Sequence, residues 1–247
     1  MRFPNTPVRR RWIRLVLLFC ALTSVRAAVA PLRAQAQAPA VPAPLLDALS
    51  ITVRRDSATV ARGTLRFRQV RTGAEVELVA SGIVVRKGLR VTAELRIDSA
   101  YQLRRYVSES RDSANRVVER IVVTSAGGRV TLERITPRRR AVREFLAKRD
   151  LVVLDSLAVV PFLALAGLGA RSTPLQFLDV RRSTITAVTL ASGAPVDLPV
   201  ADVTVTGFPV TVTGLPAGLR WWRDTRGHLL RVSWAGGGEV LRDDPPT

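Results

Sequence analysis

The sequence contains almost no cysteine or histidine. Cys20 and His228 are the only residues of their types among 247. A single cysteine cannot form an internal disulfide or a cysteine-based zinc or iron–sulfur site. One histidine excludes the H-E-x-x-H zinc motif, and the sequence also has no Walker-type phosphate loop and no G-x-S-x-G elbow. The sequence therefore predicts no metal and no cofactor, and a Ser-His-Asp triad would have to use His228.

Acidic residues are few beside basic ones. The chain has 38 lysines and arginines against 20 acidic residues, a formal net charge of +18, and Lys87 and Lys148 are its only lysines. Hydrophobic residues make up 47% of the sequence, which argues against intrinsic disorder. This length and composition suit one large domain with a substantial core.

The first 36 residues have the order of a secretory signal peptide. Five arginines between Arg2 and Arg14 precede the apolar run "LVLLFCALTSV", and small residues follow, ending in "AQA". The apolar run is about half the roughly 20 residues that a membrane span needs. We expect cleavage after Ala36 and a periplasmic or secreted protein. Removing residues 1–36, with seven arginines and no acidic residue, lowers the net charge to +11.

Two features could make this a special kind of export signal. "RRRWIR", residues 9–14, resembles a twin-arginine export signal, although an ordinary arginine-rich signal gives similar strings. Cys20 could mark a lipoprotein signal, but the preceding Phe19 is larger than the residue normally found before a lipidated cysteine. We expect an ordinary or twin-arginine signal and no lipid anchor.

The rest of the sequence predicts a mainly β fold. Residues 37–46 form a leader rich in alanine and proline, and a single antiparallel β domain is expected over residues 47–244. Between Arg90 and Asp98 apolar residues alternate strictly with polar ones, as in a strand with one buried face. About a dozen such strands with short connections predict a curved meander or half-barrel.

Two segments depart from this alternation. Residues 156–168 are apolar after Ser156, and they predict one short helix packed on the sheet, with Pro161 kinking or shortening it. Upstream, residues 134–150 are strongly basic and include Arg138, Arg139 and Arg140. This segment could meet an anionic head group or be a solvated strand, and the lack of interleaved aromatic residues argues against nucleic acid.

Three of the four tryptophans and the only histidine gather in "GLRWWRDTRGHLLRVSW", residues 218–234. The run predicts a hairpin in which Asp224 starts the turn and Gly227 closes it. A three-residue loop would pair Asp224 with His228, whereas a four-residue loop would pair Arg223 with His228. The two registers exchange the faces of Trp221 and Trp222, and both stay open because a one-residue shift inverts a strand.

The C-terminal hairpin also carries a resemblance. Its run Trp222, Asp224, Gly227, Leu229, Arg231 and Val232 resembles the ending of a large group of uncharacterised exported bacterial β-proteins. The segment "RDLVVLDSLAVVPFLAL" is similar to their link from strand to apolar helix. These proteins are similar in fold to the periplasmic lipoprotein carriers, so the resemblance implies an incomplete antiparallel barrel around a helix and no established catalytic residue.

The prediction for function is a non-catalytic exported protein that carries a lipid or another hydrophobic envelope component. Its pocket would be lined by inward residues, with Arg138, Arg139 and Arg140 meeting an anionic head group or membrane surface. The alternatives are an envelope scaffold that binds a protein through its sheet edges and a hydrolase that uses His228 or paired acids. The predicted lining residues are Phe67, Leu95, Phe162, Trp221 and Trp222.

Overall fold

Sixteen strands and one short helix form from the alternating sequence. The computed structural model describes residues 45–147, 150–168, 175–215 and 218–246, without the side chains of Leu45 and Thr72. The strands are β1 (Leu45–Arg55), β2 (Ala58–Thr72), β3 (Glu75–Arg86), β4 (Leu89–Asp98), β5 (Leu103–Asp112), β6 (Val117–Ala126), β7 (Arg129–Thr136), β8 (Arg139–Leu146), β9 (Leu151–Leu154), β10 (Leu175–Asp179), β11 (Thr184–Ser192), β12 (Val196–Val200), β13 (Val203–Thr213), β14 (Arg220–Arg223), β15 (Leu229–Trp234) and β16 (Gly238–Arg242), and the helix is α1 (Pro161–Leu168).

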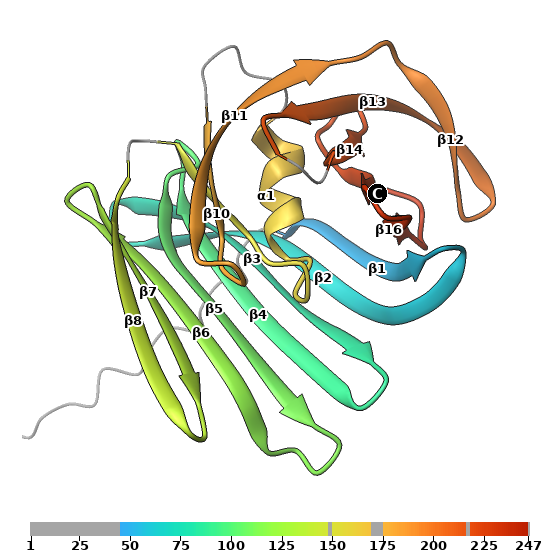
Figure 1. The fold of residues 1–247 in the computed structure, drawn as a ribbon. Coiled ribbons are helices and arrows are strands. Elements are labelled where there is room, and N and C mark those ends of the chain that lie inside the picture. Colours follow the sequence, from blue (N-terminus) through green and yellow to red (C-terminus); the bar gives the residue numbers. More distant parts are fainter. Residues whose placement is uncertain (1–44, 148–149, 169–174, 216–217, 247) are drawn as a thin grey trace, which may run out of the picture. The chain divides into compact units, whose positions relative to one another are not determined.

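All the strands join into one curved sheet (Figure 1). Its order is β8-β7-β6-β5-β4-β3-β2-β1-β16-β15-β14-β13-β11-β10-β9, and β12 pairs with β13 beside this path. Neighbouring strands are antiparallel except β9 and β10, which are parallel. The two ends of the order, β8 and β9, do not pair, so the sheet is an open half-barrel. This confirms the predicted fold class.

The sheet contains more strands than the dozen expected from sequence. Five of them, β9, β10, β12, β14 and β16, have only four or five residues, too few to show a clear alternation. The expected signal peptide and nearly all of the leader lie outside the described residues. The described residues themselves belong to one compact unit.

Alternation along the strands divides the sheet into two faces. In β4, Val91, Ala93, Leu95 and Ile97 are buried, while the residues between them are partly or fully exposed. We call the buried side the inner face, because it packs against α1, and the other side the outer face. The strand expected over residues 90–98 therefore forms with the predicted side buried.

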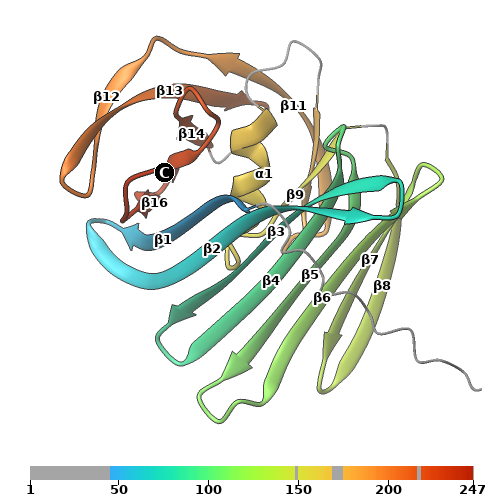
Figure 2. The same ribbon diagram turned by 180° about the vertical axis from the view of Figure 1, so that it is seen from behind.

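The helix α1 lies on the inner face, between β1–β3 and the C-terminal strands (Figures 1 and 2). It contacts β3, β9, β14 and β15, and all its residues except Gly167 are buried. A helix that is apolar on every side is stable only in such surroundings. The helix begins at Pro161, five residues later than expected, because proline lacks the amide hydrogen that later helical positions need.

A buried ion pair joins the first strand to the last. The Nη1 atom of Arg242 lies 3.0 Å from both carboxylate oxygens of Asp47, and the Arg242 side chain is wholly buried. Its remaining donors bind four backbone carbonyl groups, including that of Ala48 on β1. The pair is therefore fully hydrogen-bonded, which is the condition for burying charge. It supports the pairing of β1 with β16.

Gly82 on β3 lets the segment before α1 approach the sheet closely. A Cβ atom at this position would lie 2.4 Å from Leu65 Cδ2 and 2.7 Å from the carbonyl oxygen of Thr64. The next nearest atom, at 3.2 Å, belongs to Val160, just before α1. The carbonyl oxygen of Thr64 belongs to the backbone, so it cannot move aside by a rotamer change.

We expect Gly82→Ala to destabilise the fold by about 1–3 kcal/mol, because the added methyl group overpacks the interior. Chemical denaturation would measure the free energy of unfolding. Ser81→Ala, on the outer face of the same strand, is the matched control and should change stability little. Equal stability of the two variants would show that the backbone at Gly82 relaxes freely.

Candidate functional site

Four of the five residues expected to line a ligand pocket lie in the closed core. Phe67, Leu95, Phe162 and Trp221 are all buried in one apolar cluster, and Trp221 is 0% exposed. Leu95 borders a space of about 10 Å³ between β4, β9 and α1. A space of that size holds at most one water molecule. With α1 in place, this part of the interior has no room for an acyl chain.

Trp222 is separated from these residues by the sheet. Its ring contacts the guanidinium groups of Arg220 and Arg231, whose Cζ atoms are 5.8 Å and 5.2 Å from the ring centroid. Pro209 pairs with it on β13. Such cation–π contacts stabilise an aromatic ring at a surface. The two tryptophans therefore lie on opposite faces of the sheet, and they do not line one pocket together.

The turn before His228 follows one of the two expected registers. Asp224 N–H donates to the carbonyl of His228 at 3.1 Å, and Gly227 has a φ angle of 89°. This is the three-residue loop. A regular three-residue hairpin would place Trp222 beside Leu230, but a bulge between Trp222 and Arg223 places it opposite Arg231. The bulge buries both Leu229 and Leu230, which a regular alternation would not.

His228 and Asp224 have the geometry of two members of a catalytic triad. The Nδ1 atom of His228 lies 2.8 Å from Asp224 Oδ2. Asp224 Oδ1 also accepts hydrogen bonds from the amides of Arg226 and His228, as in an Asx turn. In the described part of the chain, no hydroxyl is hydrogen-bonded to the second ring nitrogen. The pair closes the hairpin, and among the described residues no hydroxyl completes a triad with it.

A second polar cluster, centred on Asp155, was missed by the sequence analysis. Asp155 is 1% exposed and receives hydrogen bonds from Tyr106 at 2.7 Å and from Ser108 at 3.0 Å. Arg181 binds both of its carboxylate oxygens, at 2.9 Å and 3.1 Å, and also contacts Glu119 on β6. This cluster links β5 and β6 to the segments that follow β9 and β10. One signal was available, since Asp155 is the only charge between two apolar runs.

The charged and polar groups of this cluster determine one another's protonation. Burial raises the pKa of Asp155, but the hydrogen bonds and charge of Arg181 outweigh burial and hold this pKa below its ordinary value. Burial, together with the Asp155 charge, raises the pKa of Tyr106 well above its ordinary value, so its hydroxyl stays neutral and donates. Ser108 is only 2% exposed, so no substrate reaches it in this conformation. The arrangement suits a structural clamp.

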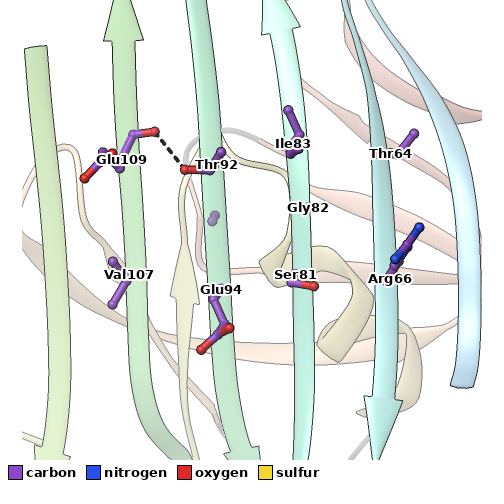
Figure 3. A pocket seen from close by; sticks show the side chains of 10 residues that line it. Thr64, Arg66, Ser81, Gly82, Ile83, Thr92, Glu94, Val107 and Glu109 are labelled. Carbon is purple, nitrogen blue, oxygen red and sulfur yellow. Dashed lines mark hydrogen bonds between the residues drawn. The ribbon is translucent and has the colours of Figure 1, made fainter. Parts of the chain in front are cut away.

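The largest of the hollows described lies on the outer face. It has a volume of about 510 Å³ and is formed by β2 to β5, with α1 on the far side of the sheet (Figure 3). Two carboxylates line it, Glu94 and Glu109. Each is held by an arginine on its own strand, since Arg96 Nε lies 2.7 Å from Glu94 and Arg111 Nη2 lies 2.6 Å from Glu109. The hollow is thus a trough with a mixed apolar and polar lining, in which both acids are paired with arginines.

A hollow of about 400 Å³ also lies on the outer side of the C-terminal strands. Residues 198–201 at the turn of the β12–β13 hairpin and residues of β15 and β16 line it. Arg231, which lines it, is bound to Glu239 at 2.7 Å. This ion pair partly neutralises the positive charge of the arginines that line the hollow.

The three arginines expected at a head group lie at the β7–β8 hairpin and are not equivalent. Arg138 is in the turn, and Arg140 pairs with Glu133. Arg139 instead lines a hollow of about 330 Å³ together with Arg134 and Arg143. The structure thus brings Arg139 together with two arginines that the sequence analysis did not single out.

β8 itself is an unpaired edge of the sheet. It is the first strand of the order, and no other strand of the described residues pairs with its free side. All of its side chains are partly or fully exposed, and Val142 and Leu146 are 53% and 83% exposed. The opposite end, β9, has only four residues and is mostly buried. β8 is therefore the longer of the two exposed edges of the described sheet, since β12, which pairs only with β13, has five residues.

Neither a metal site nor a membrane-spanning helix is found in the part of the chain that the structure describes. No group of three or more histidine, cysteine or acidic residues there could hold a metal ion. No helix there has the length and apolar character needed to cross a bilayer.

Comparison with family models and with curated proteins finds no match. Among solved structures, the chain is similar to the crystal structure of a beta-barrel-like protein of domain of unknown function DUF1849 from Brucella abortus. The match covers 79% of this chain and 93% of that chain, with 11% sequence identity and a TM-score of 0.46. No function is carried over from it. The expected similarity to periplasmic lipoprotein carriers stays a prediction.

Asp155→Asn should destabilise the protein by about 3–5 kcal/mol at neutral pH, because it leaves the buried side of Arg181 without its counter-charge. A carboxyl whose pKa is lowered by folding stabilises the native state above its unfolded pKa of about 3.9 and loses this effect as the pH falls further. The stability difference between wild type and Asp155→Asn should therefore shrink below about pH 4.

Denaturation curves measured between neutral and acidic pH would test this. Asp202→Asn, in an exposed turn, is the control and should follow the wild type throughout. A constant difference between wild type and Asp155→Asn across this pH range would contradict an ionised Asp155 clamp.

Proposed function

We propose that this protein is a non-catalytic binding protein of the cell envelope that recognises an extended acidic segment of another protein. The segment would add to the sheet as a further strand beside β8. The observation that carries the proposal is the eight-residue, exposed and unpaired edge of β8. Backbone groups along such an edge are ready to pair with an incoming strand.

The hydrogen-bonding groups of β8 can be assigned to its two sides. The amide of Ala147 donates to the carbonyl oxygen of Gly128, on the β7 side. Alternate amides of a strand point the same way, so those of Arg139, Ala141, Arg143 and Phe145 also face β7. The amides of Arg140, Val142, Glu144 and Leu146 then face the free edge. A partner strand would bind these four residues.

Charge selects the partner. Four arginines lie at positions 138, 139, 140 and 143, against Glu144 as the only acid of β8. Pairing of two β8 strands would bring like charges together, which disfavours a dimer through this edge. An acidic strand would be attracted instead, and its charge would also speed association.

Other features of the structure support binding rather than catalysis. His228 is paired with Asp224 in a turn, the acids of the outer trough are held by arginines, and the Asp155 cluster is closed to solvent. Export to the envelope rests on the signal-peptide pattern of residues 1–36. The lipid carrier is the rival proposal, and a lipid held beside Leu95 would need α1 to move, because the described space there is only about 10 Å³.

Val142→Pro should weaken binding of an acidic partner strand by about tenfold or more. Proline removes the outward amide of Val142 and blocks the approach of a strand, but it leaves the backbone hydrogen bonds between β8 and β7 intact. The measurement is fluorescence anisotropy of a labelled eight-residue peptide with alternating glutamate and valine, titrated with the full chain.

Val142→Thr, which keeps the amide, is the matched control and should bind the peptide like the wild type. Hydrogen exchange should show that the peptide protects the amides of Val142 and Glu144. A basic peptide of the same length should not bind. Binding of the acidic peptide that Val142→Pro leaves unchanged, or no binding to the wild type, would rule out strand addition at β8.

Native mass spectrometry of the exported protein separates the carrier from this proposal. We expect the bare protein after purification without harsh detergent and no lipid in an organic extract. A bound lipid that disappears in Phe67→Asp, but not in the surface variant Arg68→Asp, would instead identify a carrier.

A further inference from the structure

We propose that the inner face of the β7–β8 hairpin is a binding site for a phosphate group, formed by Arg139 and Arg143 on β8 and Arg134 on β7. The site is distinct from the free edge of β8 and does not depend on strand addition there. The group could belong to a phospholipid head group or to a free phosphorylated small molecule.

The register of the hairpin places the three arginines around one space. Thr136 pairs with Arg139, Arg134 with Ala141, and Leu132 with Arg143. Arg134 is therefore diagonal to both of the other arginines, at a spacing that long side chains bridge easily. All six residues line the hollow of about 330 Å³, together with Val142 on β8 and Ser183 from the turn between β10 and β11.

Acidic residues of the hairpin lie on its other face. Glu133 pairs with Arg140 there, and Glu144 lies 3.7 Å from Arg129. The face that carries Arg134, Arg139 and Arg143 has no acidic residue of β7 or β8. Alternation along two strands has thus separated the charges of the hairpin, leaving one compensated face and one strongly positive face.

The three arginines differ in how they are held. Arg134 Nε lies 3.0 Å from Glu119, and its Nη2 donates to the carbonyl oxygens of Val180 and Arg181. Arg139 and Arg143 form no ion pair with any carboxylate of the described residues. Arg134 thus fixes one wall of the hollow, while the other two guanidinium groups have unused donors.

Phosphate is the ligand chemistry that these groups fit. Guanidinium groups bind phosphate oxygens through paired, charge-assisted hydrogen bonds, and two or more of them match its charge. A hollow of this volume is at the small end of ligand pockets, so it suits a phosphate group with a small organic part. Ala141 forms the floor between the arginines and leaves room for the anion.

The test compares two double variants of the full chain with the same change in charge. Arg139→Gln with Arg143→Gln removes the unpaired arginines of the hollow. Arg138→Gln with Arg140→Gln removes two arginines of the same hairpin that do not line it. Isothermal titration calorimetry with inorganic phosphate at low ionic strength should show binding to the wild type and the second double variant. The first should bind at least about tenfold more weakly, because two charged hydrogen-bonding groups are lost.

Ala141→Glu gives a second readout that keeps every arginine. Its carboxylate would occupy the hollow, and phosphate binding should be lost. Leu146→Pro, which removes an outward amide of β8 at a position that does not line the hollow, should keep phosphate binding. Failure of strand addition and failure of this site can then be told apart.

Vesicles distinguish the two sources of the phosphate group. Sedimentation with phosphatidylglycerol in phosphatidylcholine that is lost in Arg139→Gln/Arg143→Gln, but retained in Arg138→Gln/Arg140→Gln, would identify a lipid head group. Phosphate binding with no vesicle binding would identify a free phosphorylated molecule. Equal weakening of phosphate binding in both double variants would overturn the site, and so would a wild type that binds no phosphate. The site would also be overturned if the two double variants differed in binding an acidic peptide but not in binding phosphate.

Discussion

The burial of α1 against the inner face of the sheet is the constraint on which the structure depends. The helix has only eight residues, all apolar, and isolated helices of this length are not stable in water. It exists because β3, β9, β14 and β15 surround it. The sheet in turn needs the helix, because its curved inner face would otherwise expose a large apolar surface. Gly82 permits the close approach, and the Asp155–Arg181 pair holds the chain on both sides of the helix.

Because this packing fills the core, the binding that we propose lies at the surface. The residues that the sequence placed in a ligand pocket, such as Phe67 and Trp221, are packed in the core. A curved sheet does not by itself make a pocket, because a helix can take the space that a ligand would need. The features left for binding are an edge, β8, and the hollows beside it and on the outer face.

Arginine serves two purposes in this molecule. Buried arginines, such as Arg242 and Arg181, hold distant strands together, and each is bound to a carboxylate and to further acceptors. At the β7–β8 hairpin, by contrast, Arg139 and Arg143 form no ion pair with the described residues. Unbalanced charge at an edge strand protects it from pairing with itself, and it also defines which partners and ligands the edge can accept.

Local patterns in the sequence predicted the strands and turns with strong signals, such as β4 and the turn from Asp224 to Gly227. They succeeded because alternation and turn chemistry depend on residues close together in the chain. The bulge that sets Trp222 opposite Arg231 and the pairing of β1 with β16 could not be derived in this way. Each depends on register or on contacts between distant segments, and a shift of one residue in register reverses which side chains meet. Only the packed sheet decides them.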